Sequence, residues 1–325
     1  MDNTYLSRIK LRREIMDSHP EATLACNKVA EPAALELYTW LTGTYLPKRF
    51  PTCFALVNRP ENTGTITTDK DDYTHLLNKT TSEPIPLHPP NPLTALRVLS
   101  SHIDTDFLIL LPSTPASPSQ TLPPQQPPTY TLQAFATTFP SGFSTLSKLS
   151  LPLASIHAPV PSYASKLEKS MDRFFARLET GKLVRRANWT VTTSPDLFAQ
   201  SGTHMRSGES SNPDADADAD AAQAAEDEAR AIASARAALE DKPVSDFRLR
   251  CELQTLHRLR ETGALVFAFK TYTYGLEEVK AEGGGAGGEA LAEATEGFAR
   301  GSAPGMSVYK REAVWGDRVR EFLRS

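Results

Sequence analysis

The sequence has few cysteines and no long apolar run, and each absence excludes a class of protein. Cys26, Cys53 and Cys251 are far apart and form no CxxC or CxxH pair, so we expect no zinc site or iron–sulfur cluster built by this chain alone. No apolar run approaches the roughly 18 residues that span a bilayer, and the start, MDNTYLSRIKLRR, has no apolar signal core. Sparse cysteines also fit a reducing compartment, so we expect a cytoplasmic protein without a membrane span.

The chain also lacks a strong charge of one sign. Its formal net charge is -4. Residues 206–242 hold ten acidic and four basic residues, a net charge of -6, which leaves +2 for the remainder. A nearly neutral body offers no strong field for nucleic acid, so no nucleic-acid partner is expected.

The sequence contains none of the common catalytic or nucleotide-binding loops. There is no Walker loop, no GxGxxG, no HExxH and no GxSxG. The glycine run at 283–288 lacks the strand and helix that a phosphate-binding loop requires. The function therefore has to be inferred from side chains placed on ordinary helices and strands.

The hydrophobic pattern predicts an α+β fold with five antiparallel strands and flanking helices. Residues 1–100 are predicted to be a mainly helical N-terminal region, and residues 101–325 a second region that contains the sheet. Low-complexity insertions interrupt the second region at 112–129, which is rich in proline, and at 206–242, which is acidic. Three predicted strands cover residues 106–112, 130–139 and 188–193, and a long amphipathic helix precedes the third of them. The fourth and fifth form a hairpin over residues 248–274 with its turn at 260–263.

The most informative stretch lies on the fourth predicted strand. With a period of two, Arg250, Glu252 and Gln254 fall on one face, where a sheet that only needed a core would carry apolar residues. Polar groups fixed on a strand can recognise or polarise a small ligand, so we predict that this trio is catalytic. Two other interpretations stay open: a solvated face paired by salt bridges, or a helix on which the leucines of 249–259 form the apolar stripe.

His157 is the candidate metal ligand. Pro159 and Pro161 stiffen the segment that joins it to the amphipathic helix over residues 163–178. A rigid tether beside an apolar helix suits an axial histidine, which needs a fixed ring and an apolar wall for a macrocycle. The alternative is a histidine that caps the helix or faces solvent.

A basic segment, RRANW at 185–189, lies just before the third predicted strand. Arg186 can pair with a carboxylate, and Asn188 can donate or accept a hydrogen bond beside it. We predict that both residues bind a cofactor. The alternative is an exposed basic turn next to a core tryptophan.

Several of these motifs together resemble one known family, the haem-dependent oxidative N-demethylase α-subunit-like family, also called the HRQ family. The matching segments are IHAPVPSY, KLEKSMDRFFARL, RRANW and LRCELQTLHRL. The fungal branch fits best, with YLSRIKLRREIM near the start and PGMSVYKREAVWGDRV near the end. The resemblance covers most of residues 5–323 and skips the two insertions.

The resemblance implies a PAS-like haem domain over residues 101–325, with His157 as the proximal iron ligand. It also implies that Arg250 and Gln254, together with Glu252, line the pocket where O2 and a small amine meet. Members with this activity oxidatively demethylate a secondary amine. NADPH, flavin and an iron–sulfur cluster would act only through partner proteins, so a separate reductase is expected.

Three functions are consistent with the sequence. The first is haem-dependent oxidative N-demethylation, a monooxygenase-type reaction that yields formaldehyde. The second is a haem-PAS sensor or binding protein without turnover. The third is a haem-free interaction domain.

Overall fold

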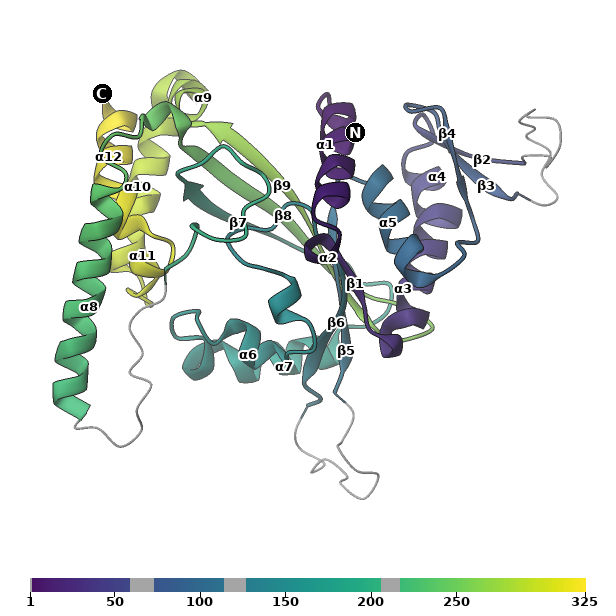
Figure 1. The fold of residues 1–325 in the computed structure, drawn as a ribbon, viewed down its shortest axis with the longest axis horizontal. Helices are drawn as coiled ribbons and strands as arrows, with labels where there is room; N and C mark the ends of the chain where they lie inside the picture. Colours follow the sequence, from purple (N-terminus) through teal and green to yellow (C-terminus); the bar gives the residue numbers. More distant parts are fainter. Residues whose placement is uncertain (1, 59–72, 114–126, 206–216) are drawn as a thin grey trace.

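A central antiparallel sheet organises the molecule. A computed structural model describes residues 2–58, 73–113, 127–205 and 217–325. Within these residues, six strands pair in one sheet that crosses the middle of the molecule (Figure 1). In pairing order they are β1 (Leu24–Cys26), β6 (Tyr130–Ala136), β5 (Asp106–Pro112), β9 (Leu265–Gly275), β8 (Arg248–Arg258) and β7 (Val184–Thr192). The chain is therefore mixed α and β, and this sheet has one strand more than the five predicted.

The two predicted hairpins are confirmed. β5 pairs with β6, and the tip of the insertion that joins them lies outside the described residues. β8 pairs with β9 along their whole length, and the turn closes where the Leu259 N–H donates to the Ala264 carbonyl at 2.8 Å. Gly263 has a φ of +68° in this turn, a backbone conformation that glycine adopts without strain.

The first hundred residues supply strands as well as helices. β1 adds to the edge of the large sheet beside β6. A second sheet pairs β2 (Phe54–Val57), β3 (His75–Asn78) and β4 (Glu83–Pro86). This part of the chain therefore completes the large sheet and also builds a small sheet of its own.

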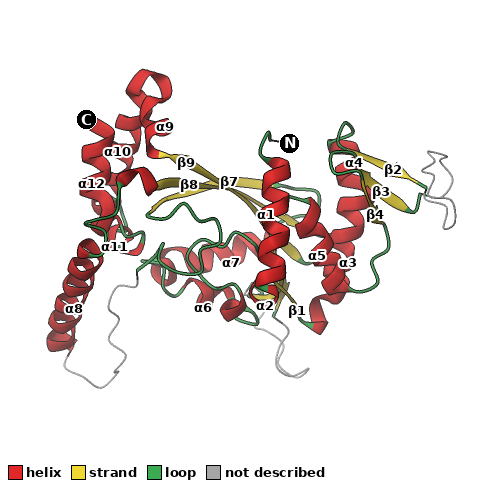
Figure 2. Cartoon of the chain, turned by 45° about the horizontal axis from the view of Figure 1, so that its top comes forward, coloured by secondary structure: helices red, strands yellow, loops and turns green. Residues whose placement is uncertain are grey.

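Helices gather at both ends of the large sheet and beneath it (Figures 1 and 2). At the N-terminal end are α1 (Tyr5–Ser18), α2 (Pro20–Thr23), α3 (Glu31–Trp40), α4 (Leu46–Arg49) and α5 (Pro92–His102). Below the strands are α6 (Leu153–His157) and α7 (Glu168–Arg177). At the other end are α8 (Ala217–Ala237), α9 (Leu276–Ala281), α10 (Ala286–Arg300), α11 (Met306–Tyr309) and α12 (Glu312–Arg324).

Side chains alternate between two faces of the sheet, and each face is covered differently. We call the face that carries Glu252 and Gln254 the site face, and the face that carries Leu253, Thr255 and His257 the groove face. On the site face, α6 contributes to an apolar cluster with residues of β5, β6 and β8. On the groove face, α3 and α5 pack against β5, β6 and β9 at one end of the sheet. In the middle of the groove face, Leu253 is 46% exposed.

A buried ion pair fixes the start of the loop after β6. The Arg12 guanidinium, on α1, donates to the Asp106 carboxylate at 2.8 Å, and both side chains are inaccessible to solvent. Asp106 also accepts hydrogen bonds from the backbone N–H groups of Thr138 and Phe139, each at 2.9 Å. Because the charged pair is hydrogen-bonded on both sides, burial is tolerated, and the loop at 138–140 is held against the site face.

Candidate functional site

β8 is a strand, and it presents the predicted trio on the covered side of the sheet. Arg250, Glu252 and Gln254 are all buried, whereas Leu253, between them, is exposed on the groove face. This arrangement follows from the period of two along a strand. The alternative of a helix over 248–258 is wrong, and so is a solvated polar face.

Four of the predicted site residues form one hydrogen-bond network. In the β7–β8 register, Arg186 lies opposite Gln254, and Asn188 lies opposite Glu252. Arg186 Nε donates to Gln254 Oε1 at 2.5 Å, and Gln254 Nε2 donates to Glu252 Oε2 at 2.7 Å. Asn188 Nδ2 donates to the same carboxylate oxygen at 3.4 Å. RRANW is therefore part of β7 itself, and its polar side chains orient the amide and carboxylate of β8.

Arg250 lies on the same face of β8, but its side chain bonds backbone carbonyls and not this network. Its side chain is 1% exposed, and its Nη groups donate to the carbonyls of Phe139 at 2.8 Å, Pro140 at 3.1 Å and Leu197 at 3.1 Å. Burial lowers the pKa of the guanidinium from its usual value. Its Nε is buried without a hydrogen-bond partner among the described residues. Arg250 thus joins two loops to β8, and only Nε is left for a ligand.

Lys310, which sequence analysis missed, completes the network from the C-terminal segment. Its Nζ donates to Asn188 Oδ1 at 3.2 Å and to the Trp189 carbonyl at 2.5 Å. The ammonium also lies over the rings of Trp189 and Phe298, at 5.5 Å and 5.4 Å from their centroids. Burial lowers its pKa to about 8, while the Glu252 carboxylate acts in the opposite direction. More than fifty residues separate Lys310 from β8, so no local pattern could reveal it.

A histidine and a tyrosine lie beside Lys310. His204 and Tyr309 have ring centroids 4.6 Å apart. Burial lowers the pKa of His204 to about 4, and the positive charges of Lys310, Lys148 and Arg250 add to the effect. His204 is therefore neutral near neutral pH. The surroundings of Glu252 thus combine one carboxylate, which can accept from a cationic group, with several cations, which can bind anionic groups.

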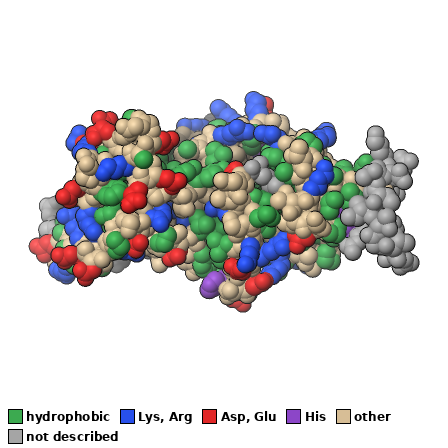
Figure 3. Space-filling view, turned by 90° about the horizontal axis from the view of Figure 1, so that it is seen from above, with side chains coloured by type: hydrophobic (Ala, Val, Ile, Leu, Met, Phe, Trp, Pro, Cys, Tyr) green, Lys and Arg blue, Asp and Glu red, His purple; other side chains and the backbone are tan. Residues whose placement is uncertain are grey.

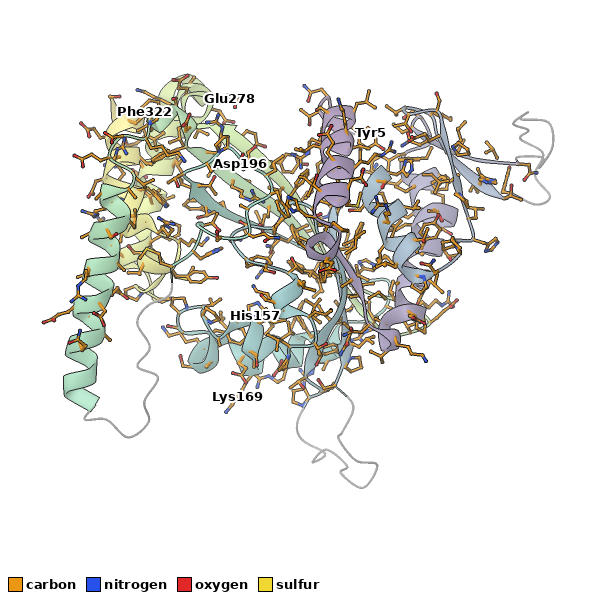
Figure 4. The ribbon with its side chains drawn as sticks, in the orientation of Figure 1. Tyr5, His157, Lys169, Asp196, Glu278 and Phe322 are labelled. Carbon is orange, nitrogen blue, oxygen red and sulfur yellow. The ribbon has the colours of Figure 1, made fainter. Side chains whose placement is uncertain are left out.

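His157 is the last residue of α6, beneath the strands (Figure 4). Its Nδ1 lies 2.9 Å from the Leu153 carbonyl, which can only accept, so Nδ1 carries the proton and Nε2 keeps a free lone pair. The ring is stacked on Tyr163, with centroids 4.8 Å apart. Burial lowers the pKa of the imidazole, and the charges of Lys148 and Arg186 act in the same direction. A neutral, oriented imidazole with a second partner on Nδ1 is the usual state of a metal-binding histidine.

The amphipathic helix after His157 is confirmed, but its expected packing is only partial. A π-helical turn, Tyr163–Leu167, precedes α7. Tyr163 and Leu178 are buried at its two ends, yet Leu167 and Phe174 are 48% and 45% exposed. None of the α7 side chains is fully buried against the described residues. An amphipathic helix whose apolar side chains are left half-exposed beside a neutral histidine offers a surface that a flat apolar cofactor can cover.

Acid is expected to destabilise the fold through buried neutral histidines. Burial lowers the pKa of His102, His204 and His257 to about 4, below the ordinary value of about 6.5. At a pH between the two pKa values, the unfolded chain binds more protons than the folded chain does. The stability that each neutral histidine contributes is therefore present above the unfolded pKa and is lost as the pH falls. From about pH 7 to about pH 5, each histidine should cost about 2 kcal/mol of unfolding free energy.

Urea unfolding at the two pH values measures this loss. In His257→Phe the loss should shrink by about 2 kcal/mol. The exposed His88→Phe is the control and should leave it unchanged. An unchanged pH dependence in His257→Phe would contradict the buried, neutral state of that ring.

Comparison with known proteins identifies the family. A family model described as haem-dependent oxidative N-demethylase, alpha subunit-like, matches residues 1–320, nearly the whole chain. The chain belongs to this family. No curated protein matches the chain. The family name agrees with the resemblance found in the sequence motifs. It indicates a haem-dependent oxidative function.

Two further findings bear on cofactors and membranes. Over the described part of this N-demethylase-like chain, no helix has the length and apolar character to cross a membrane. In the same residues, no three His, Cys, Asp or Glu side chains gather into a group that could hold a metal ion. A haem iron needs a single protein side chain, and the donor geometry of His157 fits that requirement.

Proposed function

We propose that this chain binds haem between α6–α7 and the site face, and that it catalyses oxidative N-demethylation of a small amine. The observation that carries the proposal is the pairing of His157, neutral and with Nε2 free, with a polar network on the same side of the sheet. The family match supports the choice of haem. We assign the sheet with its flanking helices to a PAS-like haem domain and, from the motifs, the chain to the fungal branch of the family.

The residues around His157 fit both parts of a haem molecule. The half-exposed apolar side chains of α7 would cover the porphyrin, because an uncovered apolar stripe gains free energy when it leaves water. Arg186 and Asn188 would bind propionate carboxylates, and Lys310 adds a second cation beside them. His157 would hold the iron through Nε2. When bound, the haem would supply the reduction of O2 that oxidises the amine.

The β8 side chains would bind and orient the amine. A secondary amine is protonated near neutral pH, so the Glu252 carboxylate would accept a hydrogen bond from it and hold its methyl group at a fixed position. Gln254 is locked between Arg186 and Glu252, which fixes the direction of the carboxylate oxygens. Arg250 Nε, which has no partner among the described residues, would donate a hydrogen bond to a bound ligand, while its Nη groups hold the loops beside the site.

Electrons would come from a separate protein. The described residues contain no cluster of metal-binding side chains, and the sequence has no nucleotide-binding loop, so NADPH, flavin and an iron–sulfur cluster would reside on partners. Each turnover would use one O2, two electrons and two protons, and would release formaldehyde, water and the demethylated amine. The small amine and O2 are the remaining partners, and we propose the cytoplasm as the location.

An absorption spectrum with an amine assay tests the proposal. Chain expressed with added haem is expected to show a Soret band, which shifts when a small secondary amine is added. With NADPH and a surrogate reductase, the same sample should release formaldehyde in proportion to the amine consumed.

Samples without amine or without reductase are the controls, and both should release none. A Soret band without formaldehyde would favour a haem sensor or binding protein. Absence of any Soret band would leave only a haem-free interaction domain.

A further inference from the structure

A large cavity of the described chain lies on the groove face, on the other side of the sheet from Glu252. It is an open groove of about 1430 Å³ between α3 and the strands β8 and β9. Small-molecule sites usually measure about 300–1,000 Å³, so this groove exceeds what one small ligand fills. Seen from above the sheet, hydrophobic side chains gather in the middle of the molecule, with Lys and Arg near the edges (Figure 3). The groove is large and open enough to receive the surface of another protein.

The floor of the groove is apolar and aromatic. Trp40, at the end of α3, is 37% exposed, and its ring lies 5.1 Å from those of both Tyr45 and His257. Leu183 and Leu253 are also exposed along the groove. His257 Nε2 is buried with no hydrogen-bond partner among the described residues. Contiguous exposed apolar side chains of this kind mark interaction surfaces.

The side chains that line the groove carry a net positive charge. Six Lys or Arg and four Asp or Glu side chains line it, a net charge of +2, whereas the whole chain carries -4. Arg185, on the exposed edge strand β7, and Arg260, in the β8–β9 turn, have no acidic partner in the described part of the chain. Unpaired cations around an apolar floor attract an acidic partner and orient its approach.

The groove is also the reverse side of the proposed cofactor site. Leu253 and Thr255 line the groove, and they alternate along β8 with Glu252 and Gln254 on the site face. Only the thickness of one sheet separates the two surfaces, because successive side chains of a strand point to opposite faces. A partner seated in the groove would therefore approach the cofactor site without displacing a helix.

We propose that this groove is the docking surface for an acidic protein that donates single electrons, of the iron–sulfur or flavin class. The inference rests on the proposed function, because it assigns the entry point of the electrons that the function requires. At each encounter the donor is oxidised by one electron and the bound cofactor is reduced by one electron, with no bond formed or broken. Apolar contact with Trp40 and Leu253 would hold the complex, and Arg185 and Arg260 would select its acidic surface.

Direct binding tests the inference apart from haem chemistry. The full chain, immobilised with and without haem, is exposed to a plant-type [2Fe–2S] ferredoxin, an acidic one-electron donor, at low ionic strength. Binding is expected in both states. The double variant R185E/R260E should weaken it about tenfold or more, since like charges then face each other. The matched control R230E/R300E changes two exposed arginines at the other end of the molecule and should bind as the native chain does.

The outcomes separate docking from function. In haem-loaded protein, R185E/R260E should slow reduction by ferredoxin about tenfold while reduction by dithionite stays unchanged. Docking is overturned if the native chain does not bind ferredoxin, if R185E/R260E and R230E/R300E weaken binding equally, or if a basic cytochrome binds as well as ferredoxin does. A chain that binds ferredoxin through Arg185 and Arg260 but holds no haem would retain the docking surface and refute the proposed function.

Discussion

Replacement of His157 by alanine is expected to abolish haem binding while the fold persists. The imidazole is the only proposed bond between iron and protein, and its Nε2 is free because Nδ1 donates to the Leu153 carbonyl. Loss of an outer partner of a metal ligand costs roughly 10–100-fold in affinity, so loss of the ligand itself should cost more than about 100-fold. The Soret band of haem-loaded protein should disappear, which absorption spectroscopy after gel filtration measures.

The fold should survive because His157 is not part of an apolar cluster. It ends a five-residue helix, whereas its neighbours Leu153 and Ile156 make the apolar contacts with the sheet. Far-ultraviolet circular dichroism should therefore match that of the native chain. His88→Ala removes an exposed imidazole and is the control, with full haem binding expected. Retention of haem by His157→Ala in folded protein would show that another residue holds the iron.

Replacement of Arg250 by leucine is expected to remove about 3–5 kcal/mol of unfolding free energy. The guanidinium is buried and joins the carbonyls of Phe139, Pro140 and Leu197, which belong to two different loops. Leucine fills much of the volume but leaves these carbonyls without donors, and each buried, unpaired polar group costs about 1–3 kcal/mol. Urea unfolding at neutral pH measures the loss.

Arg185→Leu is the matched control for Arg250→Leu. Arg185 is exposed on the neighbouring strand, and its side chain has no hydrogen-bond partner in the described part of the chain. Its replacement should change the unfolding free energy by no more than about 0.5 kcal/mol. If Arg250→Leu were equally harmless but inactive, Arg250 would act on the substrate without supporting the loops.

The sequence predicted local structure well where periodicity and capping act on neighbouring residues. The pair Asn91-Pro92 predicts a helix cap followed by a proline in the first turn, and in the structure Asn91 Oδ1 accepts from the Thr94 N–H at 2.8 Å at the start of α5. The apolar pattern near the end of the chain predicts a helix over about residues 311–323, and α12 spans Glu312–Arg324. The alternation along β8 predicted correctly which side chains share a face, although it could not say which face is covered.

Glycines show where local patterns mislead. The glycine run at 283–288 predicts a break, and the three glycines at 283–285 do have positive φ between α9 and α10, but α10 begins within the run at Ala286. A Cβ on Gly288 would lie 2.9 Å from the Leu323 carbonyl oxygen, and one on Gly287 would lie 2.5 Å from that of Val279. These glycines allow α9, α10 and α12 to approach one another closely. That requirement arises from tertiary packing and leaves no periodic signal.

By itself, the sequence determined the residues of the candidate site on β7, β8 and α6, because strand alternation and a proline-stiffened segment act over a few positions. Only the tertiary structure decided that Arg250 serves backbone carbonyls and that Lys310 joins Asn188. It also decided that the three residues of β1 extend the sheet and that a groove lies behind the site. The physical reason is that burial and pairing depend on contacts between distant segments, whereas propensity and periodicity describe only neighbours.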